Sequence, residues 1–346
     1  MHSASLFFLV VGVSLSLALP AVKSSSRPRG QKLVDQINQQ GQWKAALHPR
    51  FAGKSFEQIR KHLGAIKKSH PKNSTEKFKK SNDNLPASFD SRTNWPKCAD
   101  VIGYIYDQSS CASAWSVSSA ATMSDLICVA TNGTNKTPIS AIDITSCCDY
   151  CSIFGCKGGD TFEAFDYWYN FGVVSGSDYT RDAYCKPYPL PPCEHYNNNK
   201  TTYQKCGDNV DTPRCTIYCQ TSYKDYTYNH DKFYSKSILL SDDDVEKTQN
   251  LILTYGSVTV AFDVYEDFLY YKSGVYQHTG DDESIGGHAV RAIGWGTEDG
   301  VDYWLLANQW NSDWGDNGLV KFIRGNNNCG IENYVVTGEA DTSRLP

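Results

Sequence analysis

The sequence predicts an α+β fold with two lobes that meet at a cleft, because helical patterns come first and strand patterns come later. Residues 113–128 carry small and apolar side chains at helical spacing and contain no proline. A second helix is expected to start at Ser241 and to stop at Gly256, since three aspartates suit its first turn. Strand-forming runs separated by glycine-containing turns follow at residues 257–264, 288–295, 303–308 and 319–324.

The region between these two parts, residues 147–228, is rich in cysteine, proline, asparagine, glycine and tyrosine. We expect it to be mostly loop that disulfides hold together. The chain has 13 cysteines, so at least one thiol stays unpaired. A zinc site at Cys147, Cys148, Cys151 and Cys156 is the alternative, but no histidine lies near these cysteines in the sequence. The sequence therefore predicts a disulfide framework, with no metal ion or other cofactor.

The N-terminus indicates an oxidising compartment. Residues 3–18 form a short apolar run that ends in small side chains, which is typical of a signal peptide (residues 1–18) cleaved after Ala18. No other segment is apolar over enough residues to span a bilayer, so no membrane span is expected. The protein is expected in the secretory pathway, either outside the cell or in a lysosome. Four Asn-X-Ser/Thr patterns are predicted glycosylation acceptors, at Asn73, Asn132, Asn135 and Asn199.

Charge divides the chain into a basic N-terminal part and an acidic remainder. Residues 24–84 hold 14 Lys and Arg against 4 Asp and Glu, whereas residues 85–346 hold 18 against 34. A basic arm that binds nucleic acid is the alternative interpretation of the first part. Opposite net charges instead favour a clamp within the molecule, so no nucleic-acid partner is expected.

The basic part also contains the pattern of a short helix. Ser55 and Gln58 have the spacing of a capping box, and Gly64 can end the turn that follows. Three apolar side chains would lie on one face of this helix, at Phe56, Ile59 and Leu63. We therefore predict that residues 19–84 are a pro-segment that binds the acidic remainder of the chain. Its linker, from about residue 67 to residue 84, is the expected place of cleavage.

Four separated segments resemble the active-site regions of the papain family of cysteine peptidases, and most closely those of its cathepsin B-like members. These segments cover residues 108–115, 147–159, 286–289 and 308–315. The resemblance extends over residues 85–346 and implies a papain-like fold, with a helical lobe and a β-barrel-like lobe on either side of a cleft. An insertion at about residues 185–219 resembles the occluding loop of cathepsin B.

The resemblance also implies roles for individual residues in the cleft. His288 corresponds to the general base and acid, and Asn308 corresponds to the residue that orients its imidazole. Gln108 corresponds to the side-chain donor of the oxyanion hole, whose second donor is the backbone N–H of residue 114. Trp310 would shield the hydrogen bond between His288 and Asn308 from water.

A further set of residues is implied to bind the peptide substrate. Gly158 and Gly159 match a segment that pairs with an extended peptide backbone, and Gly287 lies in the matching motif beside His288. Tyr334 stands in the pocket for the second side chain of the substrate, in place of an acidic residue. This tyrosine predicts a preference for apolar or aromatic side chains over arginine.

The occluding-loop resemblance is only partial. His195 matches a histidine that pairs with an aspartate, which corresponds to Asp107 in this chain. A second histidine of the loop, which receives the carboxylate of the substrate, is replaced by Tyr196. A tyrosine can donate one hydrogen bond but carries no positive charge, so recognition of a C-terminal carboxylate is expected to be weakened.

The family resemblance also implies how the cysteines pair. The six implied disulfides are Cys98–Cys128, Cys111–Cys156, Cys147–Cys215, Cys148–Cys151, Cys185–Cys219 and Cys193–Cys206. Cys329 then stays free, at a position that the family keeps as a free buried thiol.

The chain departs from the family at the position of the nucleophile. The residue before Trp115 is the reactive cysteine of the family, and here it is Ala114. A methyl group can neither ionise nor attack a carbonyl, so nearly all catalysis is expected to be lost. Rescue by Ser113 is not expected, because one step along a helix turns a side chain by about 100°, away from His288. Three nearby residues also depart from two glycines and a serine of the family, namely Ser109, Ala112 and Gln309.

Three functions remain open from the sequence. In the first, the protein is an inactive, cathepsin B-like pseudoprotease that binds peptides, proteins, cystatin-type inhibitors or its own pro-segment in the cleft. In the second, the natural protein is an active secreted or lysosomal cysteine endopeptidase, and its nucleophilic cysteine was changed to Ala114 by engineering. In the third, it binds a matrix or a surface through its disulfide-rich region and needs no active cleft.

Overall fold

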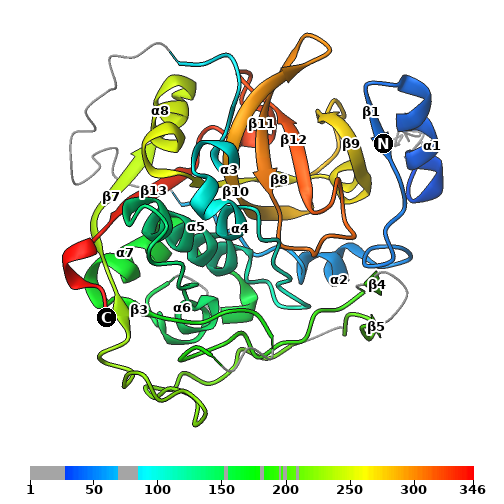
Figure 1. Cartoon of the computed structure of the whole chain (residues 1–346). Helices are drawn as coiled ribbons and strands as arrows, with labels where there is room; N and C mark the ends of the chain where they lie inside the picture. Colours follow the sequence, from blue (N-terminus) through cyan, green and yellow to red (C-terminus); the bar gives the residue numbers. More distant parts are fainter. Residues whose placement is uncertain are drawn as a thin grey trace, which may run out of the picture.

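The structure is a computed structural model, and it describes residues 28–68, 85–151, 155–179, 183–194, 196–197, 201–207 and 210–346. The predicted signal peptide, most of the predicted linker, Asn73, Asn199 and His195 lie outside the described residues. Figure 1 shows one lobe of helices, which contains α5 (Ala114–Ala130), α6 (Ala141–Cys147) and α7 (Thr161–Phe171), and a second lobe built on a large sheet. The predicted α+β fold with two lobes is therefore confirmed.

The central helix of the first lobe, α5, is buried over almost its whole length. It begins directly after Ser113, where the spacing of small and apolar residues predicts a helix. A helix that is buried on all sides must satisfy its hydroxyl groups internally. Ser118, Ser119 and Ser124 do so by donating a hydrogen bond to the carbonyl oxygen four residues earlier, at 2.6, 2.7 and 2.8 Å. Both lobes can therefore pack closely against α5.

The cysteine-rich region, residues 147–228, is mostly loop in its described part, as the sequence predicts, but it also contains one helix that was not predicted, α7. Asp160 caps the start of α7 by accepting hydrogen bonds from the backbone N–H groups of Phe162 and Glu163. Gly172, with a φ of 69°, ends the helix. These two local signals, together with the burial of the apolar face of α7 in the helical lobe, outweigh the loop-like composition of the surrounding residues.

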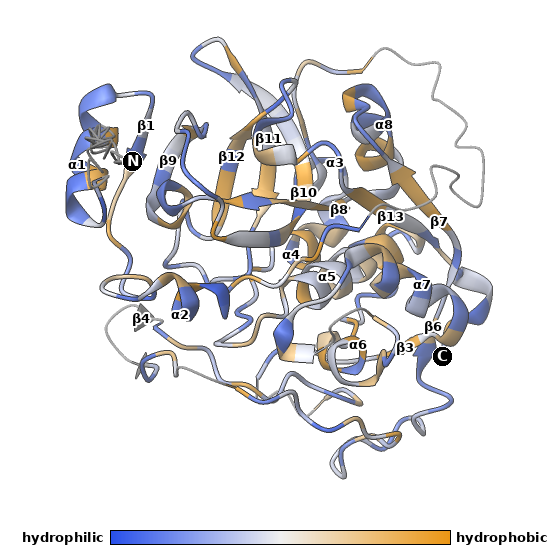
Figure 2. Ribbon diagram, turned by 180° about the vertical axis from the view of Figure 1, so that it is seen from behind, coloured by the Kyte–Doolittle hydropathy of each residue, from blue (hydrophilic) through white to orange (hydrophobic). Residues whose placement is uncertain are grey.

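The second lobe is built on one nine-stranded sheet, in which the described neighbours are antiparallel except β9 and β12. In spatial order its strands are β1 (Trp43–Ala45), β9 (Tyr271–Tyr276), β12 (Leu319–Ile323), β11 (Val301–Ala307), β10 (Gly286–Glu298), β8 (Val258–Val264), β13 (Val335–Ala340) and β7 (Ser235–Ser241), and β2 (Phe89–Asp90) pairs with β10. Figure 2 shows hydrophobic residues concentrated on the inner strands and hydrophilic residues on α1 (Gln31–Gln40) and the outer loops. The four predicted strands correspond to β8, β10, β11 and β12, whereas β7, β9 and β13 were not predicted.

The helix predicted to start at Ser241 is α8 (Val245–Tyr255), and it begins four residues later than expected. Ser241 is instead the last residue of β7, and Asp243 adopts a φ of 53° in the turn that follows. Only Asp244 caps the helix, because its side chain accepts a hydrogen bond from the backbone N–H of Lys247 at 2.8 Å. The predicted end at Gly256 is confirmed.

Short elements complete the described fold. They are α3 (Ser91–Asn94), α4 (Ala99–Ile102), β3 (Val173–Val174) paired with β6 (Lys232–Phe233), β4 (Tyr196–Asn197) paired with β5 (Thr201–Thr202), and 3-10 turns at Pro96–Cys98, Gly155–Lys157, Glu266–Tyr270, Asn328–Gly330 and Thr342–Arg344. None of the helices in the described ranges is long and apolar enough to cross a membrane. Of the two predicted glycosylation acceptors that the structure describes, Asn132 is exposed and Asn135 is partly buried.

Residues 28–68, here called the N-terminal segment, are integrated into the sheet lobe. The strand β1 pairs with β9, and the predicted capping box of Ser55 and Gln58 is present at the start of α2 (Phe56–Arg60). Seven side chains of the segment join the core of the sheet, namely Val34, Ile37, Trp43, Ala45, Phe51, Ile59 and Leu63. In Figure 1 the blue chain passes from α1 and β1 through α2 along the boundary between the two lobes.

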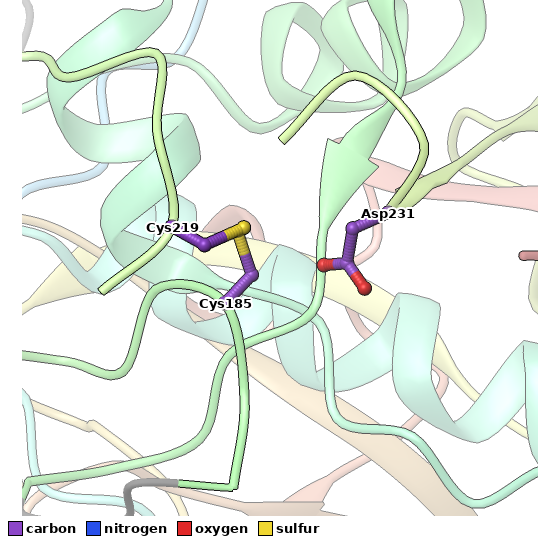
Figure 3. A group of neighbouring side chains, drawn as sticks. All are labelled: Cys185, Cys219 and Asp231. Atoms are coloured by element: carbon purple, nitrogen blue, oxygen red, sulfur yellow. A yellow bond between two sulfur atoms is a disulfide. The ribbon is translucent and has the colours of Figure 1, made fainter. Parts of the chain in front are cut away.

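All six implied disulfides are present, at Cys98–Cys128, Cys111–Cys156, Cys147–Cys215, Cys148–Cys151, Cys185–Cys219 and Cys193–Cys206. The alternative of a zinc site at four of these cysteines is excluded because their sulfurs are bonded in pairs. Among the described residues, Asp231 lies beside the Cys185–Cys219 bond in an arrangement that could suggest metal ligands (Figure 3). Its carboxylate instead accepts hydrogen bonds from Ser175 and Tyr223. Cys329 is free and only partly buried.

Candidate active site

The first residue of α5, Ala114, lies completely buried at the boundary between the lobes. Its backbone N–H donates a hydrogen bond to the carbonyl oxygen of Leu63 in the N-terminal segment, at 3.3 Å. The side chain of Gln108 donates to the same oxygen through Nε2, at 3.0 Å. A helix N-terminus and a side-chain amide therefore hold one peptide carbonyl between them. This is the arrangement that stabilises negative charge on a carbonyl oxygen.

The imidazole of His288, on β10, lies in an equally buried position. Its Nε2 lies 2.9 Å from Oδ1 of Asn308, and that oxygen also accepts the backbone N–H of Gln309 at 2.9 Å. Because Oδ1 is an acceptor, Nε2 carries the hydrogen and Nδ1 carries the lone pair. Trp310 stacks on the ring, with centroids 4.5 Å apart and an interplanar angle of 27°. The structure thus brings together the four residues that the sequence analysis placed in the cleft: Gln108, His288, Asn308 and Trp310.

The other edge of the imidazole is not engaged. Nδ1 of His288 is buried and has no hydrogen-bond partner among the described residues. Burial lowers the pKa of His288 to about 3, although the hydrogen bond to Asn308 opposes this shift. The ring is therefore neutral at physiological pH.

The serine hydroxyls near the start of α5 are engaged elsewhere. Ser113 Oγ lies 2.8 Å from the hydroxyl of Tyr188. Ser116 Oγ lies 2.6 Å from the hydroxyl of Thr145 and also donates to a backbone carbonyl. These contacts direct both hydroxyls to partners other than His288, in keeping with the expectation that Ser113 points away from the imidazole.

Glycines on both lobes pair with the backbone of the N-terminal segment. Gly159 donates its N–H to the carbonyl oxygen of Gly64 at 3.0 Å and accepts the N–H of Ile66 at 2.9 Å. On the opposite side, the carbonyl oxygen of Gly287 accepts the N–H groups of Gly64 and Ala65, both at 3.0 Å. A Cβ atom on Gly287 would lie 2.2 Å from the carbonyl oxygen of Ala65, so only glycine leaves room for this backbone.

The neighbouring Gly158 also faces the segment. Its φ is 109°, and a Cβ atom there would lie 3.2 Å from the carbonyl oxygen of Gly64. All three glycines that the sequence analysis assigned to peptide binding therefore contact, or lie against, an extended chain. The occupant of the cleft is a stretch of the same polypeptide.

The side chains of the segment reach the region of Tyr334. Ala65 packs in a small apolar cluster with Ala114, Ala261, Ala289 and Tyr334. Beyond this cluster, Nζ of Lys67 lies 5.2 Å from the ring centroid of Tyr334 and 2.5 Å from Oδ2 of Asp263. A cavity of about 360 Å³ adjoins Tyr334 and is lined in part by aspartates. The ammonium group of Lys67 therefore lies beside Tyr334. The sequence predicts instead that this tyrosine favours apolar or aromatic side chains of a substrate.

The other end of the cleft is held by aromatic and charged groups. Trp310 donates its indole N–H to the carbonyl oxygen of His62 at 2.7 Å and packs edge-on against Phe51, with centroids 4.8 Å apart. Oδ2 of Asp107 accepts Nη2 of Arg50 at 2.8 Å and Nδ2 of Asn311 at 3.0 Å. Arg50 was not singled out from the sequence, and the only signal for it was the basic character of the segment.

The predicted pairing of Asp107 with His195 stays a prediction, because His195 lies outside the described residues. Tyr196 belongs to the strand β4, and its side chain is not described. The structure does show that the carboxylate of Asp107 is already engaged by Arg50.

The sequence is similar to known proteins over most of its length. Residues 85–339 match the family described as papain family cysteine protease. The chain is 45% identical over 328 residues to cathepsin B-like cysteine proteinase 6 of Caenorhabditis elegans, covering 91% of this chain and 86% of that protein. It is 40% identical over 319 residues to a cathepsin B-like cysteine proteinase of Schistosoma japonicum, covering 90% and 91%.

A solved structure is similar over nearly the same length. The procathepsin B S9 of Trypanosoma congolense has a TM-score of 0.78 and 34% sequence identity, covering 90% of this chain and 99% of that chain. That structure is of a procathepsin, as its name states.

Proposed function

Because the chain belongs to the papain family of cysteine proteases, with a papain-like fold and cathepsin B-like relatives, we propose that it is a peptide-binding member that does not hydrolyse peptides. In this proposal Ala114 stands at the position of the nucleophile, His288 and Asn308 are the remaining catalytic pair, and Gln108 is the donor of the oxyanion hole. The cleft keeps its means of holding a peptide but has no group that can attack it.

One observation carries this proposal. The carbonyl oxygen of Leu63 is bound by both donors, Gln108 and the N–H of residue 114, while Nδ1 of His288 has no partner in the described part of the chain. In a cysteine protease the imidazole and the thiol activate each other. Loss of the nucleophile in a covalent mechanism costs on the order of 10⁶ in turnover, whereas the donors that bind the carbonyl are retained.

We propose further that residues 19–84 are a pro-segment and that residues 85–346 are the peptidase-like domain. Four ion pairs support this division, because each joins a cation of the segment to a carboxylate of the domain. They are Arg29–Glu266, Arg50–Asp107, Lys67–Asp263 and Lys68–Glu163. Since residue 114 cannot cleave the segment, its removal requires another protease. The six disulfides favour a location in the secretory pathway, outside the cell or in a lysosome.

The test compares the full chain with Ala114→Cys and with Ala114→Cys/His288→Ala. Each chain is treated with an aspartic endopeptidase that cuts the linker, and the endopeptidase is then inhibited. Hydrolysis of a dipeptide substrate with an apolar second residue is measured before and after this treatment. We expect no turnover by the parent chain in either state. Ala114→Cys should show thiol-dependent turnover only after treatment, and at rates well below those of active cathepsin B-like enzymes. Loss of this turnover in Ala114→Cys/His288→Ala would assign it to the cleft, whereas turnover by the parent chain itself would show that the protein is an enzyme.

Binding is measured on the same treated material. A cystatin-type inhibitor and a peptide of residues 60–68 are expected to bind the treated parent chain and to compete with each other. Absence of both interactions would contradict the peptide-binding half of the proposal. Turnover by Ala114→Cys at the rates of active cathepsin B-like enzymes would instead favour a protease whose nucleophile was replaced.

A second function is favoured by a different observation. On the disulfide-rich region, Ile217 and Tyr218 are 76% and 67% exposed, which is unusual for large apolar side chains. Cys215 and Cys219, on either side of them, are held in disulfides. Binding to a matrix or surface through this site is tested with Ile217→Ser/Tyr218→Ser. The surface-binding function would be supported by a ligand that does not bind this variant but still binds the parent chain while the N-terminal segment occupies the cleft.

A further inference from the structure

A glutamine beside the candidate site, Gln309, makes contacts that connect its two halves. It follows Asn308 directly after β11 and is only 3% exposed. Its Nε2 donates hydrogen bonds to Oε1 of Gln108 at 3.1 Å and to the carbonyl oxygen of Ala289 at 2.7 Å. The same nitrogen lies 3.3 Å from Nε2 of His288. An amide nitrogen has two hydrogens, and both are used by the two oxygen acceptors.

The first contact fixes the direction of the Gln108 amide. With Oε1 accepting from Gln309, the Nε2 group of Gln108 faces the carbonyl oxygens of Leu63 and Cys111, at 3.0 and 2.8 Å. The backbone N–H of Gln108 also donates to the carbonyl oxygen of Gln309 at 2.9 Å. Gln309 thereby keeps the donor of the oxyanion hole in its carbonyl-binding orientation, without any need for a nucleophile.

The contact with His288 has the opposite consequence for catalysis. Nε2 of His288 already donates to Asn308, so it offers no lone pair to the amide hydrogens of Gln309. The positive end of the amide dipole therefore lies against the ring edge without forming a hydrogen bond. In a buried site such a dipole opposes a positive charge on the ring, because little solvent screens it.

Other described groups around the ring provide no compensation. Phe262 on β8 and Trp310 contribute aromatic faces, with centroids 5.9 and 4.5 Å from that of His288. The titratable group that interacts with it electrostatically is His62 of the N-terminal segment, and this interaction is repulsive when both are charged. Among the described residues, His288 forms no ion pair with a carboxylate.

We propose that Gln309 is a positioning residue that holds Gln108 ready to bind a peptide carbonyl while disfavouring the imidazolium form of His288. The inference rests on the proposed function, and it makes Gln309 a second departure from thiolate–imidazolium chemistry, independent of Ala114. A cysteine restored at position 114 would form a weaker ion pair with His288 in the presence of Gln309 than in its absence.

The test measures the ionisation of a restored thiol in the full chain, so that it needs neither turnover nor access to the cleft. The ultraviolet absorbance of the thiolate is titrated against pH in Ala114→Cys, with Ala114→Ser as the reference for all other groups. The titration is repeated with Gln309→Ser and with Gln309→Met added to Ala114→Cys. Methionine keeps most of the volume of glutamine but has no amide dipole. The matched control is Gln249→Ser, a buried glutamine of α8.

We expect both Gln309→Ser and Gln309→Met to lower the midpoint of thiolate formation by about one pH unit, which is about ten-fold more thiolate at a fixed pH. Gln249→Ser should leave the midpoint unchanged. An unchanged midpoint in both Gln309 variants would overturn the inference. A shift with serine but not with methionine would also overturn it, because packing would then be the cause. Peptide hydrolysis by the parent chain would refute the proposed function yet would not alter this ordering of midpoints.

Discussion

The guanidinium of Arg50 lies 2.8 Å from the carboxylate of Asp107, and the two side chains are only 0% and 6% exposed. The same guanidinium donates to the carbonyl oxygen of Cys193 at 2.9 Å. A buried ion pair therefore joins the N-terminal segment to Asp107, and the same guanidinium also binds the backbone of the disulfide-bonded insertion at Cys193. Removing one partner of such a pair leaves an uncompensated charge in the interior, which costs about 3 to 5 kcal/mol.

The first prediction is that Arg50→Met releases the N-terminal segment from the cleft. We expect the amides of Gly64, Ala65 and Ile66 to lose most of their protection from hydrogen exchange. Arg29→Met is the matched control, because Arg29 is 52% exposed in its pair with Glu266 and such a pair contributes about 0 to 1 kcal/mol. Equal loss of protection in the two variants would contradict a special role for the buried pair.

Two buried histidines of the segment predict that acid weakens its binding. Burial, with a contribution from Arg50, lowers the pKa of His48 to about 4 and the pKa of His62 well below its ordinary value. In the released segment both would titrate near 6.5. The bound state therefore carries fewer protons than the released state, and its stability is lost as pH falls below about 6.5. For His48 the loss continues to about pH 4 and amounts to at most about 3 kcal/mol.

The measurement is the pH dependence of hydrogen-exchange protection at Ala65 and Ile66. His48→Gln/His62→Gln should flatten this dependence between pH 6.5 and 4, because glutamine keeps a polar side chain that does not titrate. His230→Gln, at an exposed position, is the control and should leave the slope unchanged. If the double variant retains the slope of the parent, the acid sensitivity arises from the carboxylates of the ion pairs instead.

A third prediction concerns Gly287, where an added Cβ atom would meet only the segment. The nearest atoms to such a Cβ are the carbonyl oxygen of Ala65 at 2.2 Å and two further atoms of the same residue. Gly287→Ala should therefore weaken segment binding by about 1 to 3 kcal/mol while leaving the unfolding of the domain nearly unchanged. Gly286→Ala is the control, because the nearest atom to its Cβ would be the end of the Leu63 side chain, at the longer distance of 3.2 Å. If the amides of residues 64–66 keep their full protection from hydrogen exchange in Gly287→Ala, the predicted weakening of segment binding is wrong.

Local signals explain how much of the fold could be predicted. The small-residue pattern of α5, and the alternation that gives β8, β10, β11 and β12, depend on neighbours in the sequence. The start of α8 was misplaced because three consecutive aspartates all suit a helix start, and only Asp244 has the backbone of an N-cap. The strand β13 was missed because its pairing with β7 and β8 is set by residues far away in the chain.

The candidate site divides in the same way. The family motifs identify Gln108, His288 and Asn308, which the structure brings together. They could not indicate that Gln309 bonds to Gln108, 201 positions away, or that Arg50 bonds to Asp107 across 57 positions. Such contacts depend on the packing of two lobes and a segment, and no local pattern encodes them.

The final prediction concerns the ion pair between the lobes, in which Nη1 of Arg291 on β10 lies 2.8 Å from both carboxylate oxygens of Asp125 on α5. Burial raises the pKa of Asp125, and Arg291 opposes that shift. Arg291→Met should therefore destabilise the fold by about 3 to 5 kcal/mol at pH 7. A raised pKa means that the folded state takes up a proton more readily than the unfolded chain, so the loss of stability in Arg291→Met should shrink as pH falls towards 4.

Urea unfolding of the parent chain and Arg291→Met at pH 7 and at about pH 4 measures this difference. Asp125→Asn/Arg291→Met should recover part of the loss at pH 7, and a double variant no more stable than Arg291→Met would argue against an unpaired charge as the cause.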